Sequence, residues 1–147
     1  MSDWHCTIPG KAQPQERVKG FRVGHSVRVY DPEKSRNYKA KVAEYARKYI
    51  GSHRERPLFP KGTALHVTLR VYITPPKSWS QKKKAQAYAG LILPSGRSTG
   101  DSDNYAKSIL DGLTRSGVWY DDSQAVDIDV RKRYAEWPEV EIEVNAL

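Results

Sequence analysis

The residues best suited to chemistry are aspartates gathered in the last third of the sequence. Asp101 and Asp103 lie two positions apart, directly before a helical pattern, and Asp121-Asp122 follow one helix later. A single aspartate before a helix serves as an N-cap, but two are more than one cap needs. Their like charges repel each other unless a cation lies between them or one is protonated. The pattern therefore allows either helix capping or a site for Mg²⁺, which prefers oxygen ligands.

Lys107 and Asp111 extend this acidic group along the expected helix. They lie four and eight residues after Asp103, so the three side chains share one helix face. An ordinary ion pair on a solvated face is one explanation, and it contributes only about 0.3–0.5 kcal/mol. The other is a metal-dependent phosphodiesterase, in which carboxylates hold Mg²⁺ and a lysine neutralises charge in the transition state. Spacing alone leaves both open, and it leaves the distance from Asp122 to Asp101 undetermined.

Local patterns predict the elements that must position these residues. Alternating apolar residues predict strands, the 3.6-residue period predicts helices, and Gly51 and Gly117 predict helix ends. The expected order is short strands before residue 30 (Val27–Tyr30 being the clearest), a helix from Pro32 to Ile50, a strand at Leu65–Ile73, a short helix capped by Ser78 or Ser80 and reaching Tyr88, a helix after Asp101, and strands at 126–131 and Glu139–Val144. This order predicts one α+β domain over residues 1–147, with a small mixed β-sheet packed against helices.

The net charge of +8 is unevenly distributed. Residues 1–100 hold 20 Lys or Arg against 6 Asp or Glu, a net charge of +14, whereas residues 101–147 have a net charge of −6. Binding to nucleic acids draws much of its affinity from neutralised phosphates, so the basic part is expected to hold a polyanion. The basic face of the helix at 33–50 and the segment Lys77–Lys84, which includes Trp79, are the candidate surfaces, although either could be a solvated face.

Several other classes of protein do not fit the sequence. No apolar run approaches the roughly 20 residues of a membrane span, so no membrane partner is expected. The first residues lack the pattern of a signal peptide, and the single Cys6 can form no internal disulfide, which favours a reducing cytoplasm. There is no Gly-rich phosphate loop, no Ser/His/Asp order and no His or Cys cluster with metal-ligand spacing.

Three ordered motifs in the last third of the chain resemble those of the RusA family of Holliday junction resolvases. They are Asp101-Ser102-Asp103-Asn104-Tyr105-Ala106-Lys107, then Leu110-Asp111-Gly112-Leu113, then Gly117-Val118-Trp119-Tyr120-Asp121-Asp122-Ser123-Gln124. The likeness extends more loosely upstream, to Gly10-Lys11 with Gln15 and Arg17, to Tyr30-Asp31-Pro32 with Tyr38-Lys39, and to the strand before Pro75-Pro76-Lys77. Family members often carry proline before the first aspartate, where this chain has Gly100.

The resemblance implies a RusA-like α+β fold and a homodimer that cuts four-way junction DNA by paired, symmetric incisions with Mg²⁺ or Mn²⁺. It implies that Asp101, Asp103 and Asp122 bind the metal and that Lys107 is catalytic, with Asp111 and Asp121 as secondary acidic positions. The place of action would be the cytoplasm of a bacterial or phage-infected cell, in DNA recombination and repair.

The residues expected to contact DNA are basic: Arg17, Lys39, Lys77, Lys82, Lys83 and Lys84. Two alternatives remain at this stage. One is a nuclease for other branched DNA, such as forks or flaps, and the other is a junction-binding module that does not cleave.

Overall fold

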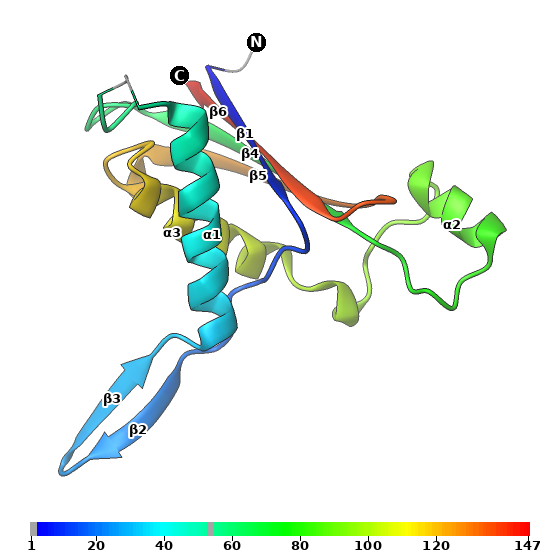
Figure 1. Cartoon of the computed structure of the whole chain (residues 1–147), viewed down its shortest axis with the longest axis horizontal. Helices are drawn as coiled ribbons and strands as arrows, with labels where there is room; N and C mark the ends of the chain where they lie inside the picture. The colour runs from blue at the N-terminus through cyan, green and yellow to red at the C-terminus, as the bar shows by residue number, and fades with distance from the viewer. Residues whose placement is uncertain (1–2, 53–54) are drawn as a thin grey trace.

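The computed structural model describes residues 3–52 and 55–147, so residues 1–2, in the segment compared with signal peptides, and residues 53–54 lie outside the described residues. Figure 1 shows the arrangement of its strands and helices. In chain order they are β1 (Trp4–Pro9), β2 (Lys19–Val23), β3 (Ser26–Tyr30), α1 (Glu33–Ile50), β4 (Leu65–Ile73), α2 (Gln81–Tyr88), the 3₁₀ turn η1 (Arg97–Thr99), α3 (Ser102–Ser116), the 3₁₀ turn η2 (Asp122–Gln124), β5 (Ala125–Tyr134) and β6 (Glu139–Ala146).

Four strands form a mixed sheet in the order β1-β6-β4-β5. β4 pairs parallel to β5 and antiparallel to β6, and β1 pairs antiparallel to β6. The parallel pair requires a long crossover, which here contains α2 and α3. The predicted α+β fold with a small mixed sheet is confirmed.

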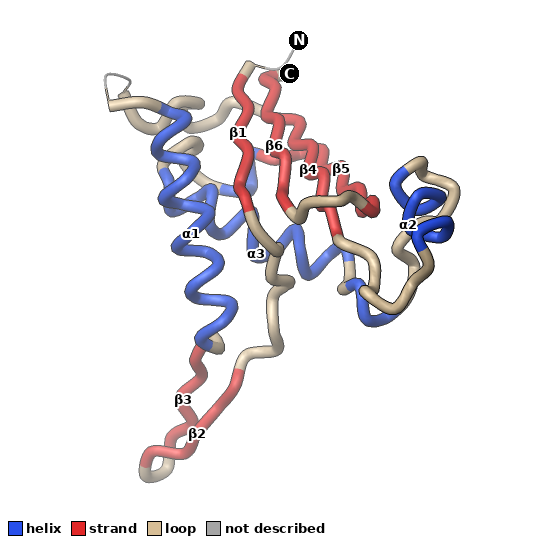
Figure 2. Tube along the Cα trace, turned by 45° about the vertical axis from the view of Figure 1, so that its right-hand side comes forward, coloured by secondary structure: helices blue, strands red, loops and turns tan. Residues whose placement is uncertain are grey.

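Alternation along β4 separates a buried face of the sheet from a polar one. Leu65, Val67, Leu69 and Val71 are fully buried, and they share one core with apolar residues of α1 and α3. Figure 2 shows these two helices together beside the sheet. On the other face of β4, Arg70 forms an ion pair with Glu143 of β6 at 3.3 Å. The expectation that β4 buries one face is therefore confirmed.

Helices α1 and α3 approach each other closely at Gly112. A methyl group built on Gly112 would lie 2.5 Å from Cβ of Val42 and 2.9 Å from the backbone oxygen of Lys39. Helix packing at this distance is possible only where a residue carries no side chain. α3 then ends at Gly117, which adopts the left-handed conformation (φ 83°), as its sequence predicts.

Two elements extend away from this body. The hairpin β2–β3 projects from the start of α1 (Figure 1), its strands pair only with each other, and every residue in them is exposed. α2 lies beyond the sheet on another side, and its N-cap Ser80 accepts a hydrogen bond from the backbone N–H of Lys83 at 3.1 Å. Among the described residues, no helix has the length and apolar character that a membrane crossing needs.

β5 differs from the other strands because it lies at the edge of the sheet. Its apolar residues Val126 and Ile128 alternate with aspartates as the sequence suggests, yet both are exposed. Among the described residues of β5, Ala125 and Val130 pack against the core, whereas Val126 and Ile128 between them do not.

Candidate active site

One open cavity of about 950 Å³ brings together several of the predicted site residues. Asp103, Lys107 and Asp111 line it from α3, one helical turn apart, and Asp122 lines it from η2. Eight residues of helix separate Asp103 from Asp111, a distance of about 12 Å along the axis. The cavity thus has Asp103 near one end and the Asp111–Asp122 region near the other.

Asp122 owes its position to the turn that precedes β5. Gln124 is buried, and its side-chain amide donates to the backbone oxygens of Pro60 (2.9 Å) and Thr63 (3.0 Å). Its side-chain oxygen accepts from the backbone N–H groups of Tyr120 and Asp121, at 2.9 Å each. This buried amide clamps η2 against the loop before β4, and the clamp holds the neighbouring Asp122 at the cavity.

The two adjacent aspartates of this turn have different electrostatic surroundings. Burial raises the pKa of Asp122, and the charges of Asp121 and Asp111 raise it further. A hydrogen bond from the Ser123 hydroxyl to Asp121 Oδ2 (2.8 Å) lowers the pKa of Asp121. Asp121 therefore acts as a local cap for the turn. Asp122 is a carboxylate crowded by like charge, as expected of a site that gains a cation.

Asp101 lies at the N-cap of α3, two residues before Asp103, and is not among the residues that line this cavity. Its backbone oxygen accepts from the N–H groups of Asn104 and Tyr105 at 3.1 Å each. Its side chain makes no capping hydrogen bond, so the carboxylate itself is not used to cap the helix. Thus Asp103 and Asp122 line one cavity, whereas Asp101 lies at the N-cap of α3 and is not part of the cavity lining.

Gly100, where family members often have proline, has a structural requirement of its own. Its φ of 84° is closed to proline and rarely adopted by residues with a Cβ. A Cβ there would also lie 2.7 Å from the hydroxyl of Tyr105. The loop is held instead by Lys132 of β5, whose Nζ donates to the Gly100 oxygen at 2.6 Å and to Thr99 Oγ1 at 3.1 Å.

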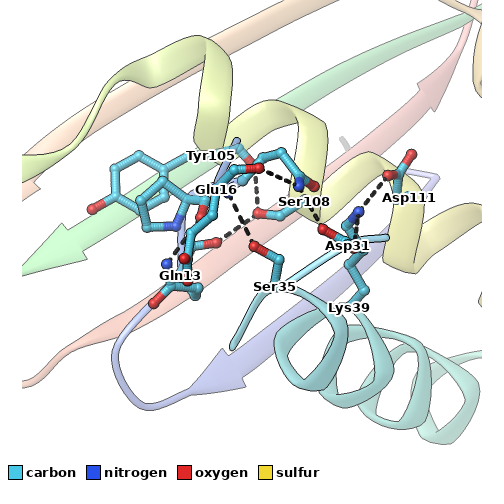
Figure 3. A network of polar contacts seen from close by, with 10 residues as sticks. Gln13, Glu16, Asp31, Ser35, Lys39, Tyr105, Ser108 and Asp111 are labelled. Atoms are coloured by element: carbon cyan, nitrogen blue, oxygen red, sulfur yellow. Dashed lines mark hydrogen bonds and ion pairs between the residues drawn. The ribbon is translucent and has the colours of Figure 1, made fainter. Parts of the chain in front are cut away.

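Lys39 does not lie on an exposed basic face of α1, as a DNA contact would require. Its Nζ donates to Asp31 Oδ2 at 2.7 Å and lies 3.0 Å from Asp111 Oδ2, and its side chain is only 7% exposed (Figure 3). The physical reason is the contact between α1 and α3, which turns this part of the helix inward. In the described chain, Lys39 serves as an internal counter-ion at the wall of the cavity.

Asp31 is a member of this network that the sequence indicated only through the loose likeness at Tyr30-Asp31-Pro32. Burial by itself would raise its pKa, but hydrogen bonds from Lys39 and from Gln15 Nε2 (2.7 Å) outweigh burial and hold the pKa below its usual value. Glu16 also lines the cavity, and its Oε1 is buried without a hydrogen-bond partner. In the sequence, only the looser motif around Gln15 and Asp31 pointed to the positions of Asp31 and Glu16.

The other predicted DNA contacts lie on the two extensions of the fold. Arg17 is exposed and lines the cavity at the base of the β2–β3 hairpin. Lys77, Lys82 and Lys83 are exposed before and on α2, and Lys84 is half-buried. Basic residues therefore lie both at the cavity and on an element well away from it.

The carboxylates suit a divalent metal in their chemistry. Within residues 3–52 and 55–147, no three His, Cys, Asp or Glu side chains already converge as a metal site. Mg²⁺ does not need such a cage, because it is commonly held by one or two carboxylates together with substrate phosphates and water. Asp103 and Asp122, facing a cavity open to solvent, are oxygen donors of the required kind.

Comparisons with known proteins show the family to which the chain belongs. Residues 9–145 match the family model described as Endodeoxyribonuclease RusA, a span that includes all three motifs of the last third. The chain is also 36% identical over 143 residues to a Bacillus subtilis (strain 168) protein described as Uncharacterized protein YqaN, which covers 96% of this chain and 94% of the relative. The suspected family is thereby confirmed: the chain belongs to the RusA family of endodeoxyribonucleases and is a hydrolase that acts on DNA.

Proposed function

We propose that residues 1–147 act as one metal-dependent endonuclease domain that resolves four-way DNA junctions by paired, symmetric cuts. The observation that carries this proposal is the gathering of Asp103, Lys107, Asp111 and Asp122 around one cavity in a chain of the RusA family. The reaction adds water across a phosphodiester, so that the water oxygen bonds to phosphorus and the sugar oxygen leaves with a proton. The place of action would be the cytoplasm of a bacterial or phage-infected cell.

Asp101, Asp103 and Asp122 are the residues that would hold Mg²⁺, or Mn²⁺ in its place. When bound, the metal polarises the phosphodiester and helps to generate the attacking hydroxide. Lys107 lines the same cavity, where its positive charge would offset negative charge that develops on phosphate. Asp111 is partly neutralised by Lys39, so it contributes less repulsion toward DNA than an unpaired carboxylate would.

The basic residues outside the cavity support a role in holding junction arms. Arg17 lies beside the reaction site, and Lys77, Lys82 and Lys83 are exposed on the segment that carries α2. Contacts between such side chains and phosphates fix the position of a protein on DNA without reading its sequence.

A homodimer would present two such sites to the two opposing strands of a junction. The β2–β3 hairpin is the surface that supports this part of the proposal. Its strands expose large apolar side chains on both faces, including Phe21, Val27 (69%) and Val29 (67%), and an isolated two-stranded hairpin is only marginally stable in water. Sedimentation equilibrium is expected to show a dimer, and a monomer at concentrations that give paired cuts would contradict it.

Two other activities fit parts of the same structure. A nuclease specific for forks or flaps would use the same carboxylates and basic residues. A non-cleaving junction-binding module would need the fold but not the acidic group, so Asp103 and Asp122 at one cavity favour an active enzyme.

Replacement of Asp103 by asparagine tests the assignment of the site. Asp103→Asn is expected to lower junction cleavage by roughly 100-fold or more, because even partners that only support metal ligands contribute 10–100-fold. Junction binding should be unchanged or tighter, since one negative charge is removed. Cleavage is measured on a labelled four-way junction with Mg²⁺, and binding by fluorescence anisotropy.

Asp127→Asn is the matched control for this experiment. Asp127 lies on the edge strand β5, outside the residues that line the cavity, and its replacement removes the same charge. We expect it to cleave as the unaltered protein does. Full cleavage by Asp103→Asn would refute the proposed site.

A further inference from the structure

A second cavity, of about 210 Å³, lies where the parallel strands β4 and β5 end. Ile73 and Tyr134, the last residues of the two strands, line it together with Thr99 from the loop before α3. The carboxyl ends of neighbouring parallel strands are a recurrent position for ligand sites. Because Thr99 is only two residues before Asp101, an occupant of this cavity would lie close to the candidate active site.

The chemistry of this second cavity, called here the aromatic cavity, differs from that of the first cavity. The first cavity, which is lined by Asp103, Asp111 and Asp122, is called here the acidic cavity. Its lining includes three tyrosines and one charged residue, Lys11, and contains no carboxylate. The tyrosines are Tyr72, Tyr105 and Tyr134. Aromatic rings with a few polar groups at their margin suit a flat, neutral heterocycle. The acidic cavity is lined by five carboxylates, so its lining is less suited to a flat, neutral heterocycle.

Hydrogen bonds hold the wall nearest to Asp101 in place. The Tyr105 hydroxyl donates to the backbone oxygen of Thr99 at 2.7 Å, and Lys132 donates to Gly100 and Thr99 as described above. These three bonds hold the residues that immediately precede Asp101, and Tyr105 and Thr99 among their partners line the aromatic cavity. A ligand seated there would therefore have a defined position relative to the Asp101 carboxylate.

The opposite wall connects the aromatic cavity to the basic helix α2. The Tyr134 ring contacts the Trp79 ring edge to face, with centroids 5.3 Å apart. Lys83 Nζ in turn lies 4.0 Å from the centroid of the Trp79 ring. A DNA strand whose phosphates follow the lysines of α2 would thus pass the mouth of the cavity on its way to Asp101.

We propose that the aromatic cavity receives one nucleobase, unstacked from the DNA beside the phosphodiester that is cut. This inference rests on the proposed function and adds a base-binding site to it. The volume equals about seven water molecules at roughly 30 Å³ each, which is room for a single base and not for a folded strand. Unstacking costs least where pairing is already interrupted, as at a branch point, and stacking on the aromatic side chains of the cavity would offset that cost.

The first test compares junctions that contain or lack the base in question. Junctions are made with an abasic site at each nucleotide that flanks the cleaved phosphate, and their affinities are measured with Asp103→Asn protein so that the DNA stays intact. Loss of the critical base is expected to weaken binding by about 5- to 150-fold, the range that corresponds to about 1–3 kcal/mol. Other abasic positions should have little effect.

Two cavity variants then show whether that base binds in the aromatic cavity. Tyr134→Leu removes a ring from the lining, and Thr74→Phe places a ring in the cavity from an exposed position. Both variants should bind the intact junction more weakly than protein with the unaltered lining does. An abasic site at the critical position should weaken their binding little further, because the substitution and the missing base remove the same contact. Tyr49→Leu, at the exposed end of α1, is the control and should keep the full abasic effect.

Photo-crosslinking gives an independent readout of the same contact. A 5-iodouracil placed at the critical position is expected to crosslink to Tyr72, Tyr105 or Tyr134, and mass spectrometry identifies the residue. A crosslink to residues elsewhere would overturn the base-binding proposal. So would an abasic site that weakens binding equally in protein with the unaltered lining and in both cavity variants. Failure of the proposed function is distinguishable, because the protein would then fail to bind the junction, or Asp103→Asn would still cut it.

Discussion

Lys39 lies between two carboxylates that would otherwise face each other without a counter-ion. Its ammonium group contacts Asp31 at 2.7 Å and Asp111 at 3.0 Å, and all three residues line the acidic cavity. The Lys39–Asp31 pair is costly to break, because the two side chains are only 7% and 19% exposed and the remaining partner stays largely desolvated, whereas Asp111 is 46% exposed. At the scale of single residues, the active-site wall is therefore held by electrostatics as well as by apolar packing.

The pH dependence of stability should report this network. The pKa of Asp31 is lowered in the folded chain, so its ion pair stabilises the fold fully above the ordinary carboxylate pKa of about 4, and this stabilisation is lost as the pH falls below that value and through the lower pKa of the folded chain. Asp31→Asn is expected to reduce the free energy of unfolding by about 1–2 kcal/mol at pH 7. Urea denaturation at pH 7 and at pH 3 measures the difference.

The difference between the two proteins should shrink as the pH falls from 7 to 3, because Asp31 is progressively protonated as the pH approaches its lowered folded-state pKa, whereas asparagine is neutral throughout. Glu44→Gln is the control, because Glu44 forms only an exposed pair with Lys48 at 3.9 Å, and such pairs contribute little. An equal loss of stability by Asp31→Asn at both pH values would show that the ion pair is not the cause.

Among the elements, the contact between α1 and α3 positions most of the acidic cavity. α3 carries Asp103, Lys107 and Asp111 on one face and buries Ile109 and Leu113 on the other. Its separation from α1 is set at Gly112, where a side chain would meet Val42 and the backbone of Lys39. A change at this contact should therefore alter both the stability of the fold and the position of Lys39.

Gly112→Ala tests this contact directly. The added methyl group would be 2.5 Å from Val42 Cβ, and overpacking of this kind typically costs about 1–3 kcal/mol. Gly96→Ala is the matched control, since nothing lies within 4 Å of its added Cβ and its φ of −73° suits alanine. Thermal unfolding followed by circular dichroism compares the two. A Gly112→Ala protein as stable as the control would contradict the close packing described here.

The positions of helices and strands could be predicted from nearby residues, whereas the contacts between elements far apart in the sequence could not. Alternation in Leu65–Ile73 and the glycines at 51 and 117 predicted a buried strand and two helix ends, because these features depend on nearby residues. The spacing of Asp103, Lys107 and Asp111 placed them on one helix face for the same reason. The burial of Lys39 required knowledge of how α1 packs on α3. The place of Asp122 depended on the parallel pairing of β4 with β5 and on the clamp made by Gln124.

At the scale of the whole molecule, positive charge and apolar surface lie on the parts that extend from the body. The hairpin β2–β3 and the segment around α2 project on different sides of the sheet (Figure 1), and the acidic cavity and the aromatic cavity lie in the body that they flank. The uneven charge of the sequence has a partial structural counterpart, since three carboxylates of the last third, Asp103, Asp111 and Asp122, line the proposed reaction site. The basic remainder offers surfaces for phosphate.

The measurement that tests the central claim most directly is cleavage of three labelled DNAs with Mg²⁺: a synthetic four-way junction, a fork and a linear duplex. We predict paired nicks at symmetric positions in opposing strands of the junction, and little or no cutting of the other two. Selective cutting of forks would support the broader nuclease, and binding of the junction without cutting would support a non-cleaving module. Either result would contradict the proposal that this RusA-family chain resolves four-way junctions.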